Sequence, residues 1–284
     1  MKEAVKTVAH YPVYYYTCYD EMKKRGFNVD GEQWASDVKK VVQRLNLDPT
    51  QGLNVMSVGC GSGTVDKPII DILLTMYSSI RFIAIDPVVE ELNKFKQLVK
   101  DNKDEWKNVV FDFHTTTIEE YLEVNGTQTF GFIVMSHSAY HFKDVETTVV
   151  DLYNRLVKGG MLFTKMIDGG WEKFLLKVGE YFTDPMYNFI GTHFIEDVIK
   201  RRIPNARYET KKREYTVDMV DSFDEESQAG AYMIDSTTVI YKFRETCKPE
   251  IKKKLLEYLV ECCRKEGDKI LFSADERDLV IFKD

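Results

Sequence analysis

The chain has 284 residues, 44% of them hydrophobic, which is long enough for one large domain with a substantial core. Its net charge is −7, and lysine and arginine gather only in short runs such as Lys211–Arg213 and Lys252–Lys254. Because nucleic-acid binding depends on basic surfaces that neutralise phosphates, the composition argues against a nucleic-acid partner. The sequence contains no apolar run of about 18 residues, so it predicts no membrane-spanning helix.

The first half of the chain shows strands and helices in alternation after an opening helix. Trp34, Val38 and Leu45 recur at helical spacing, whereas Leu53–Val58 is a short apolar run typical of a buried parallel strand. We expect Lys158–Gly160 to cap the fourth helix after the first strand. The predicted elements are helix 32–46, strand 53–58, helix 67–77, strand 80–85, helix 88–101, strand 109–113, helix 117–123, strand 130–135, helix 144–157 and strand 161–166.

After residue 167 the alternation becomes less regular. The pattern predicts helices at 171–182, 194–202 and 249–266, and strands at 207–217, 237–243, 269–273 and 278–282. We expect the last two strands to form an antiparallel pair at the sheet edge. The stretch 183–235 is rich in aromatic residues and is either part of a substrate pocket or a surface insertion. Strand–helix alternation as a whole predicts an α/β fold with a mostly parallel sheet and helices on both faces.

The five cysteines show no spacing typical of a disulfide framework or a metal site. An odd number of unpatterned thiols indicates a reducing compartment, so we expect a cytoplasmic protein. The adjacent Cys262 and Cys263 are expected to lie together in a buried helix.

A glycine-rich loop directly follows the first predicted strand. Gly59, Gly61 and Gly63 allow the backbone to turn tightly and to approach a ligand closely. A nicotinamide-binding loop would more often have glycine or alanine at position 64, where this chain has Thr64. Asp86 ends the second predicted strand, where an acid can accept hydrogen bonds from two ribose hydroxyls. The loop and the acid together predict a nucleoside-binding site.

This pattern resembles the class I S-adenosylmethionine-dependent methyltransferases, which have a Rossmann-like seven-stranded fold. Further segments resemble the histamine N-methyltransferase family in particular, and the resemblance runs from about Tyr14 to the end of the chain. These collinear segments are Phe132–Met135, Ala139–Asp144, Gly169–Lys173, Thr216–Phe223, Phe243–Cys247 and Lys269–Phe272.

The resemblance implies S-adenosylmethionine as cofactor, S-adenosylhomocysteine as product, and a set of cofactor-binding residues. The family has a serine where this chain has Ile118, so the adenine contact is either lost or moved to Thr117. The residues implied to bind the cofactor are Gly59, Gly61, Gly63, Asp86, Glu91, Thr117, Ile118 and Ser136.

The acceptor site implied by the resemblance differs from the family at two polar positions. His137 stands where the family has a substrate-binding glutamine, and Ser273–Asp275 stands where it has an asparagine, which makes Asp275 a candidate contact. Tyr140 and His141 occupy the place of a tyrosine pair, and His141 is expected to share a helical face with His137. Either Asp30 or Glu32 would hold an ammonium group. The aromatic residues implied to line the acceptor pocket are Trp171, Phe182 and Phe243.

We therefore expect N-methylation of a small amine, with histamine or a related imidazole or aromatic amine as acceptor. The alternatives are the same fold with an O- or carboxyl acceptor, a non-catalytic module that binds S-adenosylmethionine, and a nicotinamide-dependent oxidoreductase. No metal site is expected, because His137 and His141 have no evident third ligand. The chain is expected to be a monomer with a single methyltransferase domain over 1–284. Within it, 1–50 forms a helical lid, 51–167 the cofactor-binding core, and 168–284 the substrate-pocket elements and C-terminal strands.

Overall fold

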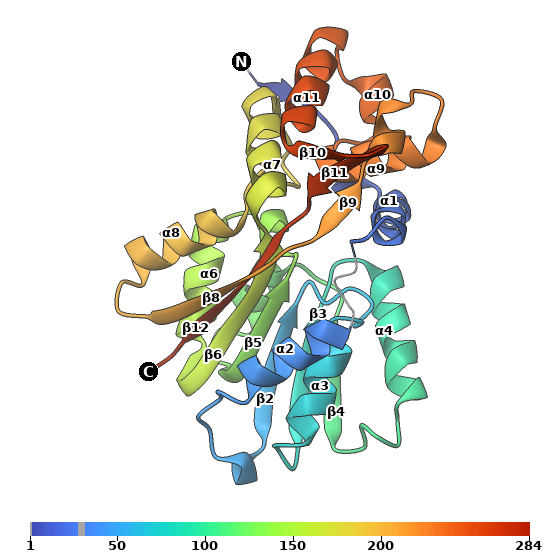
Figure 1. Cartoon of the computed structure of the whole chain (residues 1–284). Helices are drawn as coiled ribbons and strands as arrows, with labels where there is room; N and C mark the ends of the chain where they lie inside the picture. The colour runs from blue at the N-terminus through green and yellow to red at the C-terminus, as the bar shows by residue number, and fades with distance from the viewer. Residues whose placement is uncertain (1, 28–31) are drawn as a thin grey trace. The chain divides into compact units, whose positions relative to one another are not determined.

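The structure is a computed structural model that describes residues 2–27 and 32–284 (Figure 1). The chain divides into two compact units. The sheet unit comprises 30–165, 195–211 and 278–284, and the helical unit comprises 1–29, 166–194 and 212–277. That the whole chain acts as one domain stays a prediction.

A seven-stranded sheet with strand order β4-β3-β2-β5-β6-β12-β8 dominates the sheet unit. The pairs β2–β3, β3–β4, β2–β5 and β5–β6 are all parallel, and the antiparallel strands are at the edge. This confirms the predicted fold class. The strands are β2 (Leu53–Val58), β3 (Ile80–Ile85), β4 (Val109–His114), β5 (Phe130–Ser136), β6 (Leu156–Ile167), β8 (Arg207–Arg213) and β12 (Glu276–Phe282). Strands β2 and β3 have one exposed residue each, as expected of central strands covered on both faces.

Helices of the sheet unit follow the strands in alternation, and α2 and α3 pack against each other (Figure 1). Helix α5 begins with a capping box, in which the Thr117 side chain accepts from the Glu120 amide and Glu120 accepts from the Thr117 amide. The helices are α2 (Glu32–Val42), α3 (Asp66–Leu74), α4 (Val89–Asp101), α5 (Ile118–Val124), α6 (Val145–Asn154) and α8 (Thr192–Arg202), with short 3₁₀ turns η2 (Pro49–Gln51) and η3 (Ala139–His141).

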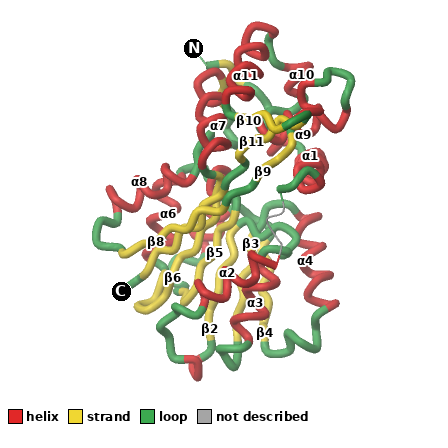
Figure 2. Tube along the Cα trace, viewed as in Figure 1, coloured by secondary structure: helices red, strands yellow, loops and turns green. Residues whose placement is uncertain are grey.

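Three segments far apart in the sequence build the helical unit, which is mostly helix in Figure 2. Helix α1 packs against α9, and α7 packs against both α9 and α11. The strands of the helical unit form an antiparallel sheet of order β10-β11-β9 and a parallel pair, β1 with β7. The helices are η1 (Val8–His10), α1 (Pro12–Lys24), α7 (Gly169–Tyr181), η4 (Val220–Phe223), α9 (Gln228–Thr238), α10 (Phe243–Thr246) and α11 (Pro249–Glu261). The strands are β1 (Glu3–Ala4), β7 (Phe182–Thr183), β9 (Thr216–Asp218), β10 (Cys263–Glu266) and β11 (Lys269–Ser273).

Four predicted helices are too long. The helices predicted over 32–46 and 67–77 end at Val42 and Leu74, and two others lose their last residues to strand pairing. The helix predicted over 144–157 ends at Asn154, and Lys158–Gly160 belong to β6 rather than to a helix cap. A register shift in the β5–β6 pairing accommodates these residues. The helix predicted over 249–266 ends at Glu261, since 263–266 pair with β11. Cys262 and Cys263 are therefore not a helical pair.

Two strand predictions and one pairing prediction are also wrong. The strand predicted over 207–217 is two strands, β8 and β9, which belong to different sheets. Residues 237–243 do not form a strand, because α9 continues to Thr238, where the hydroxyls of Thr237 and Thr238 donate to helix carbonyls four residues earlier. The strands at 269–273 and 278–282 do not pair with each other. Strand β11 lies between β10 and β9, whereas β12 lies between β6 and β8.

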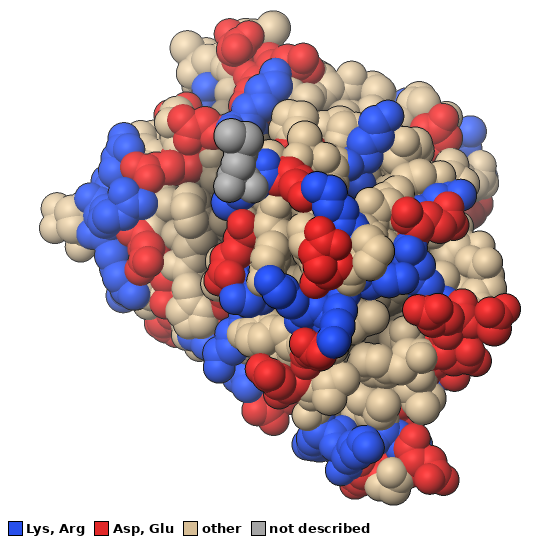
Figure 3. Space-filling model, turned by 90° about the horizontal axis from the view of Figure 1, so that it is seen from above, with Lys and Arg blue, Asp and Glu red and all other residues tan. Residues whose placement is uncertain are grey.

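Charges of both signs are mixed on the face shown in Figure 3. Across the described residues, none of the helices combines the length and apolar character that a bilayer span requires.

Candidate functional site

The glycine-rich loop turns immediately after β2. Gly59, Gly61 and Gly63 all have positive φ angles, of 65°, 53° and 76°. A Cβ on Gly59 would lie 2.5 Å from the Cβ of Ser138, and one on Gly63 would lie 2.4 Å from the Phe95 ring. The Gly59 amide donates to the Ile85 carbonyl at 2.8 Å, which ties the loop to the end of β3. Both the conformation and the space at positions 59 and 63 therefore require glycine.

Asp86 follows β3 and is held against this loop. One carboxylate oxygen accepts the Gly61 amide at 2.8 Å, and the other accepts the Val88 amide at 2.8 Å. The carboxylate is 6% exposed, and burial raises its pKa while the two amide hydrogen bonds oppose that rise. Each oxygen keeps a further lone pair, so the group can still accept from two neighbouring hydroxyls.

The carboxyl ends of the adjacent parallel strands β3, β2 and β5 lie at one edge of the sheet. Asp86, Gly59 and Ser136 are at or directly after these ends, where open α/β sheets bind ligands. The Ser136 hydroxyl is buried and, among the described residues, lacks a hydrogen-bond partner. An orphaned hydroxyl beside a glycine loop and a buried acid fits a nucleoside cofactor.

The other predicted cofactor residues lie on α4 and at the start of α5. Glu91 is 3% exposed and pairs with Lys94 at 2.5 Å. The Thr117 side chain caps α5, and Ile118 is buried behind it. Their cofactor contacts stay predictions.

His137 follows β5 in a left-handed conformation with φ 52°, which is uncommon outside glycine. Its amide donates to the Lys165 carbonyl at 2.8 Å, so the turn is fixed to β6. The Tyr140 ring is buried, 6.5 Å from the His137 ring and 4.7 Å from that of the exposed His141. The predicted shared helical face of the two histidines is wrong, because only 139–141 form a 3₁₀ turn and His137 precedes it.

The three predicted acceptor aromatics, Trp171, Phe182 and Phe243, are all buried in the helical unit, at 6%, 1% and 0% exposure. The Trp171 indole N–H donates to the Thr237 carbonyl at 3.1 Å, and the Phe243 amide donates to Asp235 at 3.0 Å. Packing and these hydrogen bonds account for their positions, and their contact with a cation stays a prediction.

The predicted polar acceptor contacts are only partly described. The Asp275 carboxylate is buried and binds Ser273 Oγ at 2.7 Å and Lys212 Nζ at 3.0 Å. Asp30 and the side chain of Glu32 lie outside the described residues.

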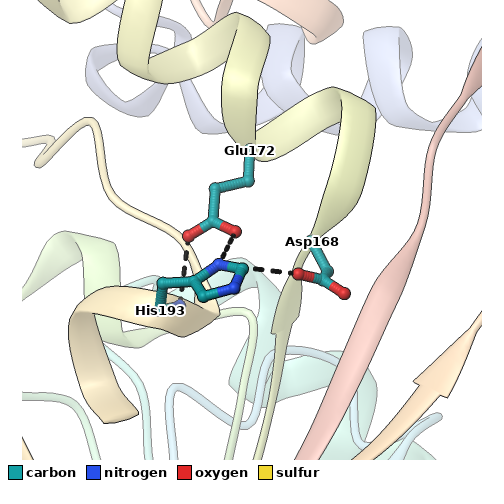
Figure 4. A group of neighbouring side chains, drawn as sticks. All are labelled: Asp168, Glu172 and His193. Carbon is teal, nitrogen blue, oxygen red and sulfur yellow. Dashed lines mark hydrogen bonds and ion pairs between the residues drawn. The ribbon is translucent and has the colours of Figure 1, made fainter. Parts of the chain in front are cut away.

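A group that the sequence did not predict consists of Asp168, Glu172 and His193 (Figure 4). Glu172 lies 2.5 Å from His193 Nδ1 and Asp168 lies 3.7 Å from the same atom. The Glu172 carboxylate, by accepting a hydrogen bond from His193, raises the pKa of His193, and burial raises the pKa of Glu172. The sequence signal for this group was limited to two acids, Asp168 and Glu172, four residues apart after a predicted strand. His193 lies 21 residues after Glu172, and nothing in the sequence connects it to the two acids.

Known proteins resemble this chain in sequence and in fold. It is 24% identical to bovine histamine N-methyltransferase over 245 residues, covering 82% of each chain, and 25% identical to the mouse enzyme over 242 residues, covering 81% of each. The YcgJ protein of Bacillus subtilis shares its fold with a TM-score of 0.55 at 13% identity, over 88% of this chain and 99% of that one. The plantazolicin methyltransferase BpumL in complex with SAH has a TM-score of 0.52 at 11% identity, over 98% and 93%.

The family model described as a methyltransferase domain matches residues 31–211. That match covers more than half of the chain and includes the glycine loop, Asp86 and the carboxyl end of β5. The chain belongs to the methyltransferase-domain family and is an S-adenosylmethionine-dependent methyltransferase.

Proposed function

We propose that this methyltransferase acts on the nitrogen of a small amine, and that histamine or a related imidazole or aromatic amine is its acceptor. The observation that carries this proposal is the similarity to histamine N-methyltransferases along about four-fifths of both chains. The mixed charges on the face shown in Figure 3 support a small-molecule rather than a nucleic-acid or membrane partner, and the five free cysteines support a cytoplasmic protein. That the protein is a monomer is a further part of this proposal.

The cofactor residues we propose lie in the sheet unit. Gly59, Gly61 and Gly63 let the backbone approach the cofactor closely, and Asp86 accepts from the ribose hydroxyls. Ser136 supplies a polar group at the end of β5, and the remaining contacts come from Glu91, Thr117 and Ile118. S-adenosylmethionine, when bound, supplies a methyl group activated by a positively charged sulfur.

With the methyl group already activated, the work of the protein is to position the acceptor nitrogen and to exclude water. Positioning of this kind contributes roughly 7–11 kcal/mol to lowering a barrier. An alkyl ammonium with a pKa near 10.4 is neutral in only about 1 in 2,500 molecules at pH 7, whereas an imidazole with a pKa near 6.5 is mostly neutral. An imidazole nitrogen is therefore ready to accept a methyl group without prior deprotonation.

In this proposal His137 orients the acceptor ring or takes up the released proton, and Tyr140 and His141 line the site beside it. Either Asp30 or Glu32 holds the charge of the acceptor side chain. Trp171, Phe182, Phe243 and Asp275 supply the further acceptor contacts implied by the family resemblance.

The deciding experiment is methyl transfer from labelled S-adenosylmethionine to a panel of amines headed by histamine, with calorimetry of cofactor binding alongside. Product from histamine supports the proposal. Cofactor binding with product only from phenols or carboxylates moves the acceptor to another class. Binding without turnover on any acceptor makes the protein a non-catalytic module.

The role of His137 is tested by His137→Ala on the acceptor that the panel identifies. Loss of a positioned acid–base group lowers kcat by about 100-fold or more, while the affinity for S-adenosylmethionine stays unchanged. The matched control is His114→Gln, because His114 pairs with Asp112 at 3.1 Å and has no assigned role. Unchanged turnover by His137→Ala removes His137 from the mechanism.

A further inference from the structure

Asp168, Glu172 and His193 come together where β6 ends and where α7 and α8 begin (Figure 4). Asp168 is the N-cap residue of α7, Glu172 lies in its first turn, and His193 is the second residue of α8. One ligand atom from each, an imidazole nitrogen and two carboxylate oxygens, lie within 4.8 Å of one another. None of the three has a role in the methyl transfer proposed above.

Asp168 directs one oxygen into this group. Arg277 donates from Nε to Asp168 Oδ2 at 3.0 Å, and its Nη2 forms an ion pair with the same oxygen at 2.9 Å. Asp168 Oδ1 has no hydrogen-bond partner within the described chain, although the residue is only 1% exposed, and it lies 3.7 Å from His193 Nδ1. Leaving a buried carboxylate oxygen without a donor is costly, so a cation at this point would relieve a real penalty.

Glu172 is positioned by the backbone. Its Oε1 accepts the His193 amide at 3.1 Å, which leaves Oε2 beside His193 Nδ1. Gly191 makes room for this approach, because a Cβ there would lie 2.5 Å from the Glu172 carboxylate. Thr192 Oγ1 donates to the Ile167 carbonyl at 3.0 Å and thereby holds the start of α8 against the end of β6. The donor atoms are therefore arranged before any ligand binds.

We propose that Asp168, Glu172 and His193 form a binding site for a divalent transition-metal ion of the Zn²⁺ type. One nitrogen and two oxygen donors suit Zn²⁺ or Mn²⁺, whereas Ca²⁺ and Mg²⁺ prefer oxygen ligands alone. The ion replaces the proton between His193 Nδ1 and Glu172 Oε2, and Arg277 stays on Asp168 Oδ2 as the outer contact that orients this ligand.

The three ligand atoms lie within 4.8 Å of one another and must shift by about 1 Å to hold such an ion. A tetrahedral zinc with bonds of about 2.1 Å separates its ligand atoms by roughly 3.4 Å. The 3.7 Å between Asp168 Oδ1 and His193 Nδ1 is close to that value, and the 2.5 Å between Glu172 Oε2 and His193 Nδ1 must widen by about 1 Å. Three protein ligands leave a fourth position for water or another ligand.

The test is calorimetric titration of Zn²⁺ into the full-length protein, produced without a histidine tag and stripped with EDTA. We expect one site per chain, with affinity at least about 10-fold weaker in His193→Ala and in Glu172→Gln. Glu172→Gln is the sharper variant, because its amide oxygen can still accept the His193 amide. The same protein should broaden and shift the electron paramagnetic resonance spectrum of Mn²⁺.

His114→Ala is the matched control, since it removes another histidine that lies beside a carboxylate, Asp112. The His193 side chain is 60% exposed, so His193→Ala should fold, and its melting temperature in EDTA measures what the His193–Glu172 pair alone contributes to stability. No Zn²⁺ uptake by the wild type overturns the proposal, as does uptake that His193→Ala leaves unchanged. If Glu172→Gln fails to fold, His193→Ala alone decides.

Discussion

In the sheet unit, the buried Asp86 accepts amides from Gly61 and Val88, which are 25 and two residues away along the chain. In the helical unit, the buried Asp235 accepts from Tyr14, 221 residues away. Asp184 of the same unit likewise accepts the Thr7 amide, 177 residues away. Asp86 is satisfied within one strand–loop neighbourhood, whereas Asp235 and Asp184 hold distant segments together.

This difference predicts how much stability each unit loses when a hydrogen-bonding group is removed. Ordering distant segments costs loop-closure entropy, so the contacts that join them must be strong. Hydrogen bonds to a buried charge are strong but leave costly unpaired groups when broken. Three substitutions test this difference between the buried acids and loops of the two units.

Asp235→Ala should have the largest effect. Asp235 is 1% exposed and accepts from the Tyr14 hydroxyl at 2.7 Å, the Lys242 amide at 2.8 Å and the Phe243 amide at 3.0 Å. Removing the acceptor leaves these donors unpaired, so the free energy of unfolding should fall by about 3–5 kcal/mol in urea titrations. Asp20→Ala is the control, because Asp20 is an exposed acid on α1. Equal losses from the two variants would refute the view that buried acids hold the helical unit together.

Gly59→Ala should perturb the sheet unit locally. The new Cβ would lie 2.5 Å from Ser138, and alanine would have to adopt φ near 65°. Left-handed backbone and overpacking together cost about 3 kcal/mol. If this strain moves the loop out of its cofactor-binding conformation, the affinity for S-adenosylmethionine should fall about 100-fold in calorimetry.

Gly126→Ala is the matched control for that experiment, since a Cβ at Gly126 meets no atom within 4 Å. Gly126→Ala should bind the cofactor as the wild type does. Wild-type affinity in Gly59→Ala would show that the loop is not the cofactor cradle.

Asp66→Asn probes the exception in the sheet unit, a buried acid whose Oδ1 has no hydrogen-bond partner in the described part of the chain. Burial raises the pKa of Asp66 to about 7 from 3.8 in a free side chain. Between these values the unfolded chain ionises first, so stability falls as pH rises from 4 to 7, and the loss is complete above 7. The variant cannot ionise and should be about 2 kcal/mol more stable than the wild type at pH 8.

Urea titrations of both proteins at pH 4 and pH 8, without cofactor, measure this gain. The gain is smaller than the pKa difference alone implies, because the asparagine amide must itself find acceptors. A stability difference that does not change with pH would show that Asp66 is not a buried, destabilised acid.

The regular part of the fold was accessible to sequence reasoning because its determinants are local. Strands β2 and β3 have their predicted bounds, since each is a short apolar run followed by a glycine loop or an acid. The placement of Gly59 and Asp86 at neighbouring strand ends follows from parallel pairing, which the strand–helix alternation already implied.

The secondary-structure predictions are wrong where pairing or packing with segments far away in the chain determines the local conformation. Residues 263–266 have helical periodicity but pair with β11, and 237–238 have β-branched side chains yet remain in α9, where their hydroxyls donate to carbonyls of the same helix. Local propensity differences are small, so pairing and packing override them. His193 was missed for the same reason, because only folding brings it to Asp168 and Glu172.

The strand–helix order of the sheet unit and the glycine loop with its acid follow from residues close together in the chain, and the resemblance of collinear segments to a known family implied the methyltransferase class and the cofactor. Only the tertiary structure decided the antiparallel sheet of β9, β10 and β11, the left-handed turn at His137 and the group around His193. Those features arise from contacts between segments far apart in the chain, and burial and hydrogen bonding among them outweigh what any single segment prefers.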